Sequence, residues 1–150
     1  MVMYQLLEET KMKYTKGYKY RTDETVVYDI SGWGLVPSKE INCGLLTLTA
    51  YGYLVIHRGY SWDGASGAID TDTILFPSLV HDALYELLRG GLGEHVSGKF
   101  PADVREACDK IFRSLCLERK MTAFRAGYVY DAVRVAGFPA SSKPRKVFEA

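Results

Sequence analysis

The stretch FPSLVHDALYELLRGG, residues 76–91, combines the apolar pattern of a helix with an ionisable pair at its centre. Its apolar side chains recur at i, i+4, i+7 and i+8, the spacing of a helix that faces a core: Val80, Leu84, Leu87 and Leu88. We expect His81, Asp82 and Tyr85 to lie beside this stripe. An ionisable pair at the margin of a core is either a structural hydrogen-bonding device or a site of chemistry.

The C-terminal half of the chain has the helical period throughout. It predicts three helices, at about 77–89, 101–117 and 122–136. Pro77 and Pro101 suit the first turns of helices. Thr122 is a candidate cap for the third helix, and Gly137 is a candidate for its end. The glycine-rich segment RGGLGEHVSGKF, residues 89–100, permits the first two helices to form an antiparallel hairpin.

The second predicted helix has one apolar face and one charged face. The apolar face carries Val104, Ala107, Cys108, Ile111 and Leu115. Arg105, Glu106 and Arg113 are expected to lie outside.

The chain before residue 70 has the pattern of β-strands. The predicted strands are YKYRT (18–22), TVVYDI (25–30) and LLTLTAYGYLVIHRGY (45–60). In the last segment, roughly alternating residues around a YGY turn predict a hairpin: Leu46, Leu48, Tyr51, Tyr53 and Val55. The sequence therefore predicts an α+β fold, in which a small antiparallel sheet packs on a three-helix C-terminal half.

Length and composition indicate one domain over residues 1–150, large enough to bury a core. We expect a β-rich part at 14–60, a glycine-rich loop at 59–68, a helical part at 77–137 and an exposed tail at 138–150. A formal net charge of +1 gives no electrostatic argument for a nucleic-acid partner. The sequence has no apolar stretch of transmembrane length and no signal peptide, so we expect a protein made in the cytoplasm.

The three cysteines give no paired framework. An odd number of cysteines fits a reducing compartment, and Cys43, Cys108 and Cys116 are interpreted as small apolar core residues.

Candidate chemistry centres on His81. If the first two helices are antiparallel, Asp103 at the start of the second could lie beside the His81 ring. A carboxylate on one ring nitrogen would fix the tautomer and leave the other nitrogen free as a base. Asp82 points about 100° away, where it could bind a hard cation such as Ca²⁺. The loop GYSWDGASGA, with Asp63 and Gly64, could donate the remaining oxygen ligands.

Each of these residues also has a purely structural interpretation. His81 could be a helix-packing histidine, and a carboxylate such as Asp103 is favoured in any first helical turn. Asp63 could serve a turn. His57 is interpreted as a strand residue that faces solvent. A metal phosphohydrolase of the HD type would need an upstream histidine on a helix, and zinc peptidase chemistry lacks a third ligand.

The motifs HDALYELLRGG and ADVREACDKIF resemble the two active-site helices of the phospholipase A2 superfamily, in its disulfide-poor bacterial and viral-capsid versions. This resemblance covers roughly residues 60–117. It implies that His81 activates a water, that Asp103 orients His81 and that Tyr85 supports them. It also implies Asp82 as a calcium ligand, with Asp63 and Gly64 as weaker candidates. The usual glycine-rich calcium-loop signature is absent, and WDGAS only approximates it.

A second resemblance spans nearly the whole chain. The order KGYKY, GYSWDGAS, SLVHDALYELLR, AD and RAGYVYDAVRVAG is similar to a phage and prophage family, domain of unknown function 1353. This resemblance implies a bacteriophage or prophage origin and synthesis in a bacterial host.

Two hypotheses on function follow. The first is a calcium-dependent ester hydrolase of the phospholipase A2 type, acting on a phospholipid or another ester. The second is a non-catalytic virion protein, such as a tail or head accessory subunit, whose partners are other virion proteins.

Overall fold

The computed structural model describes residues 14–16, 20–63, 72–96 and 99–142. Its strands are β1 (Tyr14–Lys16), β2 (Tyr20–Thr22), β3 (Val26–Asp29), β4 (Ile41–Cys43), β5 (Leu46–Leu48), β6 (Tyr53–Ile56) and β7 (Ser61–Trp62). Its helices are α1 (Asp72–Arg89), α2 (Leu92–His95), α3 (Pro101–Glu118) and α4 (Ala123–Ser142), with a short 3-10 turn at Ser31–Trp33. The predicted α+β fold is confirmed.

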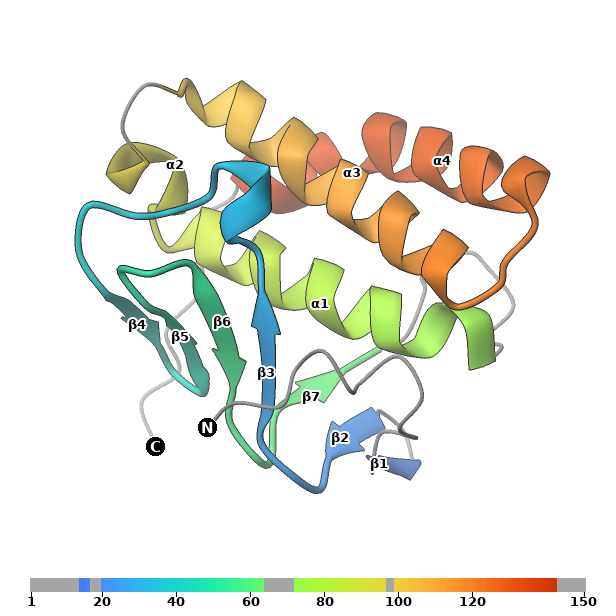
Figure 1. Ribbon diagram of the computed structural model, residues 1–150, viewed down its shortest axis with the longest axis horizontal. Coiled ribbons are helices and arrows are strands. Elements are labelled where there is room, and N and C mark those ends of the chain that lie inside the picture. The colour runs from blue at the N-terminus through green and yellow to red at the C-terminus, as the bar shows by residue number, and fades with distance from the viewer. Residues whose placement is uncertain (1–13, 17–19, 64–71, 97–98, 143–150) are drawn as a thin grey trace.

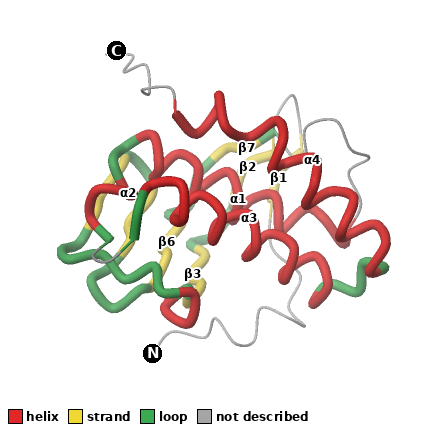
Figure 2. Tube along the Cα trace, turned by 90° about the horizontal axis from the view of Figure 1, so that it is seen from above, coloured by secondary structure: helices red, strands yellow, loops and turns green. Residues whose placement is uncertain are grey.

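The strands form two small antiparallel sheets beneath a layer of helices. One sheet has the order β3-β6-β5-β4 and the other the order β1-β2-β7. Figure 1 shows α1 lying between the four-stranded sheet and the pair α3–α4. The view from above in Figure 2 shows the same layering, with the helices covering the strands. Helix α1 is therefore the central element of the molecule.

The burial of α1 follows from this central position. Five side chains in its segment 79–87 are completely buried: Leu79, Val80, Ala83, Leu84 and Leu87. They join one core with the buried residues of the four-stranded sheet and of α3. A smaller cluster joins the start of α1 to the end of α3 and to α4, through Ile74, Phe112, Cys116, Met121, Ala126 and Val129. Cys108 and Cys116 are buried as predicted, and Cys43 is half-buried.

The hairpin β5–β6 forms where the sequence predicts it, and one of its faces is buried. Leu48 pairs with Leu54, and Leu46 pairs with Ile56. Directly opposed residues of an antiparallel pair point to the same face, so Leu54 and Ile56 are buried. Tyr53 and Val55 face the other side and are half-buried. The buried side chains Leu46, Leu48, Leu54 and Ile56 therefore share one face of the hairpin.

The predicted helices are present with different ends. Helix α1 begins at Asp72, so Pro77 lies inside the helix and not in its first turn. Pro101 does occupy the first turn of α3. The Thr122 hydroxyl accepts a hydrogen bond from the Arg125 N–H at 3.2 Å, which confirms the predicted cap. Helix α4 continues through Gly137 to Ser142, so the predicted end at Gly137 was wrong.

Within the described ranges, no helix has both the length and the apolar character that a membrane crossing requires.

Candidate active site

The His81 ring lies against the carboxylate of Asp109. Nε2 of His81 is 2.7 Å from Oδ1 of Asp109, across the interface between α1 and α3. Asp109 is completely buried, whereas His81 retains a small exposed fraction of 8%. The predicted pairing of His81 with a second-helix carboxylate therefore occurs, but with a different residue.

The expectation that Asp103 is the partner of His81 was wrong, and the register of the two helices explains why. His81 is the tenth residue from the start of α1, and Asp109 is the tenth from the end of α3. Two antiparallel helices of equal length with matched ends place these residues opposite each other. Asp103 lies six residues earlier on α3, about 9 Å along the axis, where it is exposed in the first turn.

Four donors converge on the two oxygens of Asp109. Oδ1 accepts hydrogen bonds from His81 and, at 2.6 Å, from the Tyr85 hydroxyl. Oδ2 accepts one from Arg134 Nη1 at 2.7 Å and a long one from Arg105 Nη1 at 3.5 Å. An ionised carboxylate has about four acceptor sites, so this buried group is fully occupied. The partners satisfy a charge that would otherwise be costly to bury.

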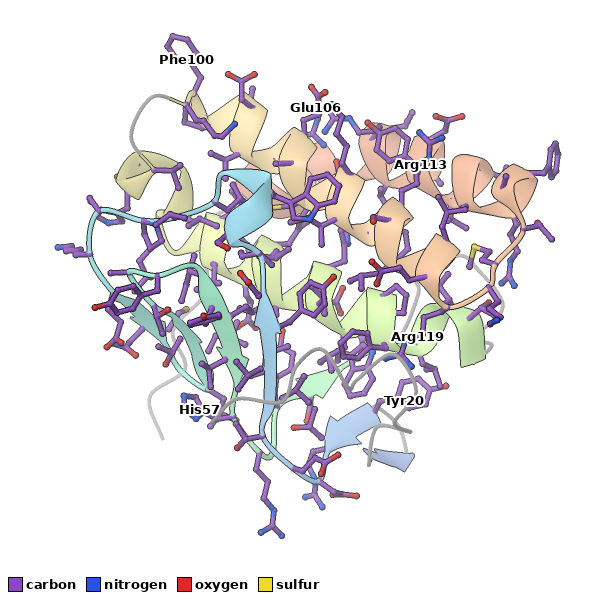
Figure 3. All side chains as sticks on the ribbon, in the orientation of Figure 1. Tyr20, His57, Phe100, Glu106, Arg113 and Arg119 are labelled. Carbon is purple, nitrogen blue, oxygen red and sulfur yellow. The ribbon has the colours of Figure 1, made fainter. Side chains whose placement is uncertain are left out.

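These partners come from three helices. Arg134 belongs to α4 and Arg105 lies one turn before Asp109 on α3. The Arg105 side chain is only 13% exposed, so the prediction that it lies outside the helix pair was wrong. The reason is that its guanidinium turns inward to the buried carboxylate. Glu106 and Arg113 do lie on the outer surface of α3 (Figure 3).

Tyr85 contacts both members of the His81–Asp109 pair. It lies one turn after His81 on α1, and their ring centroids are 4.2 Å apart. Burial, together with the hydrogen bond to Asp109, raises the pKa of the Tyr85 hydroxyl well above its usual range. The hydroxyl therefore stays protonated and acts as a donor at physiological pH.

The surroundings of Asp109 determine the tautomer of His81. A carboxylate that is ion-paired with arginine can only accept hydrogen bonds, so Nε2 of His81 carries the proton. In the neutral ring, Nδ1 then has the free lone pair. Nδ1 has no hydrogen-bond partner among the described residues. The His81 residue as a whole keeps an exposed fraction of 8%.

The walls around the imidazole are aromatic. Phe112 of α3 lies 4.9 Å from the His81 ring centroid, and Tyr85 contacts the ring as well. These contacts restrict the plane of the ring, so that its two nitrogens have fixed directions.

The structure brings Asp82 close to Asp63. Burial is the largest cause that raises the pKa of the half-buried Asp82 carboxyl, to about 7, and the nearby Asp63 carboxylate raises it further. The positive charge of Arg89 and a hydrogen bond from the Asp63 backbone N–H oppose this rise. Asp63 precedes α1 by a loop, so its proximity to Asp82 brings two of the predicted metal ligands together.

The structure describes only part of the predicted metal site. Among the described residues, no group of three or more His, Cys, Asp or Glu side chains could hold a metal ion. Gly64 and the rest of the glycine-rich loop, residues 64–68, lie outside the described residues. Asp82 and Asp63 fit a cation in one respect. The negative charge of Asp63 makes ionisation of Asp82 less favourable, and a cation between them would make it more favourable.

His57 lies on the four-stranded sheet, well away from α3 and α4 (Figure 3). Its Nε2 is 3.0 Å from the Thr47 hydroxyl, which donates a hydrogen bond to Asn42. Because the hydroxyl proton is used on Asn42, Nε2 of His57 is the donor to Thr47. His57 follows the last residue of β6 and is half-buried, so it is neither within a strand nor fully exposed, contrary to the sequence interpretation.

Sequence reasoning missed Asp109, Arg105 and Arg134 as members of the site. One signal for Asp109 was available, because it lies three residues before Phe112 and seven before Cys116. These spacings place it on the same side of a helix as two residues that are buried. No comparable signal existed for Arg134, which depends on how α4 packs against α3.

No protein-family model, curated protein or solved structure matches this chain.

Proposed function

We propose that the protein is a phage- or prophage-encoded, calcium-dependent ester hydrolase of the phospholipase A2 type, in which Asp109 takes the role expected of Asp103. The observation that supports this proposal most strongly is the geometry of His81. One ring nitrogen is held at 2.7 Å by a buried carboxylate, the other has no hydrogen-bond partner among the described residues, and the residue is 8% exposed. A histidine fixed in this way is a general base.

The proposed reaction uses water as the nucleophile. Nδ1 of His81 takes a proton from a water molecule while the water oxygen bonds to the ester carbonyl carbon. The imidazolium that forms is stabilised by Asp109 through the Nε2–H hydrogen bond. When the tetrahedral intermediate collapses, the bond to the alcohol oxygen breaks and His81 returns its proton to that oxygen. The products are an acid and an alcohol, and His81 is again neutral.

Asp82 and Asp63 are the residues that would hold calcium. Both supply carboxylate oxygens, the ligand type that Ca²⁺ prefers, and they lie close enough for Asp63 to raise the pKa of Asp82. Bound calcium would supply positive charge for the oxyanion that develops on the ester carbonyl. Asp82 follows His81 directly in the sequence, so the proposed base and the proposed calcium ligand lie on the same turn of α1.

A direct assay tests this proposal. Hydrolysis of phosphatidylcholine in mixed micelles containing calcium would be followed by release of fatty acid. A positioned general base typically contributes about 10²–10⁴ in rate, so we expect His81→Asn to lose at least about 10²-fold in kcat. His57→Asn is the matched control, since His57 is a histidine on the sheet with its own hydrogen bond, and it should retain activity.

Thermal unfolding of both variants would show that each remains folded. An inactive wild-type protein, or equal activity of His81→Asn and wild type, would contradict the proposal.

A non-catalytic virion protein remains the second candidate, and one surface favours it. Three large apolar side chains of α4 are exposed: Phe124, Tyr128 and Val135. Their spacing of four and seven residues places them within about 40° of one another on the helix. A face of this kind can be covered in an assembly. Stoichiometric presence of the protein in purified virions, with no hydrolytic activity, would favour this role over the enzymatic one.

A further inference from the structure

Arg134 of helix α4 contacts the carboxylate of the His81–Asp109 pair. Arg134 Nη1 lies 2.7 Å from Oδ2 of Asp109. Arg105 of α3 lies 3.5 Å from the same oxygen and 3.5 Å from the backbone carbonyl of Arg134. The two arginines therefore meet at the side of the carboxylate that faces away from His81.

The two oxygens of Asp109 are held with unequal strength. Oδ1 has two short contacts, to His81 and Tyr85, whereas Oδ2 has one short contact and one at the limit of a hydrogen bond. The terminal torsion of an aspartate has a broad energy profile. Without Arg134, only the long Arg105 contact would hold Oδ2, so the carboxylate could turn about its contacts at Oδ1 and change the direction in which Oδ1 meets Nε2 of His81.

We infer that Arg134 is a positioning residue, which fixes the Asp109 carboxylate and through it the direction of the His81 ring. This inference rests on the proposed function and extends the site to a third helix. Arg134 does not contact the reacting atoms itself. Its side chain is 27% exposed, while that of Asp109 is completely buried. The carboxylate is thus sealed from solvent, but the space occupied by the guanidinium is open to it.

This difference in exposure permits a chemical-rescue experiment. Arg134→Ala should lower kcat by about 10²-fold, the size of effect that a displacement of about 1 Å causes in a catalytic group, and leave KM unchanged. Added guanidinium ion should restore a large part of kcat, because it can enter from solvent and bind Oδ2. An equal concentration of sodium ion should not restore activity, since it supplies ionic strength without the donor geometry.

Arg113→Ala is the matched control. Arg113 lies on α3 and its guanidinium is 5.5 Å from the ring centroid of Tyr130 on α4. Its removal also weakens the contact between α3 and α4, but it leaves Asp109 untouched. We expect this variant to retain the wild-type kcat. Equal losses in Arg113→Ala and Arg134→Ala would overturn the inference, because the effect would then come from loosened helix packing.

A spectroscopic measurement tests the same inference without reference to activity. The Nε2 proton of His81, held by Asp109, should give a slowly exchanging downfield proton resonance in the nuclear magnetic resonance spectrum of the full chain. We expect this resonance in wild type and Arg113→Ala, its loss by exchange in Arg134→Ala, and its return with guanidinium. A resonance unchanged in Arg134→Ala would overturn the positioning role. Absence of ester hydrolysis by the wild type would instead overturn the proposed function, so the two failures are distinguishable.

Discussion

Nε2 of His81 and Oδ1 of Asp109 lie 2.7 Å apart, although 28 residues separate them along the chain. The distance results from the register of α1 and α3, whose midpoints face each other, and the intervening α2 and its flanking residues allow the chain to turn back. The same register places Tyr85 one turn further on, where its hydroxyl reaches the same carboxylate oxygen. One buried acid thus organises two side chains of α1.

Removal of the Tyr85 hydroxyl tests the contribution of this shared carboxylate to stability. Tyr85→Phe keeps the buried ring but leaves Oδ1 of Asp109 with one donor fewer. Loss of a buried partner typically costs about 1–3 kcal/mol, so the free energy of unfolding, measured by urea denaturation, should fall by this amount. Tyr128→Phe is the control, because Tyr128 is largely exposed and its change should stay within about 0.5 kcal/mol. Equal effects in both variants would argue against a stabilising role for the Tyr85 contact.

The raised pKa of Asp82 predicts how stability depends on pH. The folded-state pKa is about 7, compared with 3.8 for the free carboxyl, so the native state holds this proton more tightly than the unfolded state does. The Asp82 contribution to the free energy of unfolding should therefore decrease from about pH 4 to about pH 7, by up to roughly 4 kcal/mol, and level off above that. Asp82→Asn should lack this decrease. Parallel pH profiles for the two proteins, measured by urea denaturation, would show that Asp82 is not perturbed.

Bound calcium should raise the free energy of unfolding under conditions in which ionised Asp82 lowers it. At pH 8, Asp82 is mainly ionised and experiences the negative charge of Asp63, so a bound cation stabilises the folded state. The stabilisation should reach about 2.7 kcal/mol at a calcium concentration of 100 times Kd, seen as a rise in Tm. Removal of calcium with a chelator should reverse the rise, and Asp82→Asn should abolish it. A rise of the same size in Asp82→Asn would place the calcium elsewhere.

Much of the fold could be predicted from the sequence because the apolar period changes near residue 70. The helical spacing around Val80 and Leu84 identified α1, and strand alternation identified the β5–β6 hairpin. Helix ends were less predictable. Pro77 is compatible with a first turn but lies inside α1, and a glycine such as Gly137 permits a helix to end without requiring it.

The site was predictable only where local sequence determines it. His81, Asp82 and Tyr85 follow from positions on one helix; His81 and Tyr85 are buried next to the apolar stripe, and Asp82 is half-buried. The partner of His81 depends instead on the register between two helices. A shift of six residues in this register would exchange Asp109 for Asp103. Arg134 depends on a third helix, whose packing angle has no local signature in the sequence.

The turnover of two aspartate variants tests the central claim most directly. Asp109→Asn keeps the size of the side chain but replaces one acceptor oxygen with a donor amide, so it disturbs the tautomer and orientation of His81. We expect its kcat for ester hydrolysis to fall by about 10²–10⁴, with a folded protein by thermal unfolding. Asp103→Asn changes an exposed side chain on the same helix and should retain the wild-type kcat. Full activity in Asp109→Asn, or its loss in Asp103→Asn alone, would contradict the account.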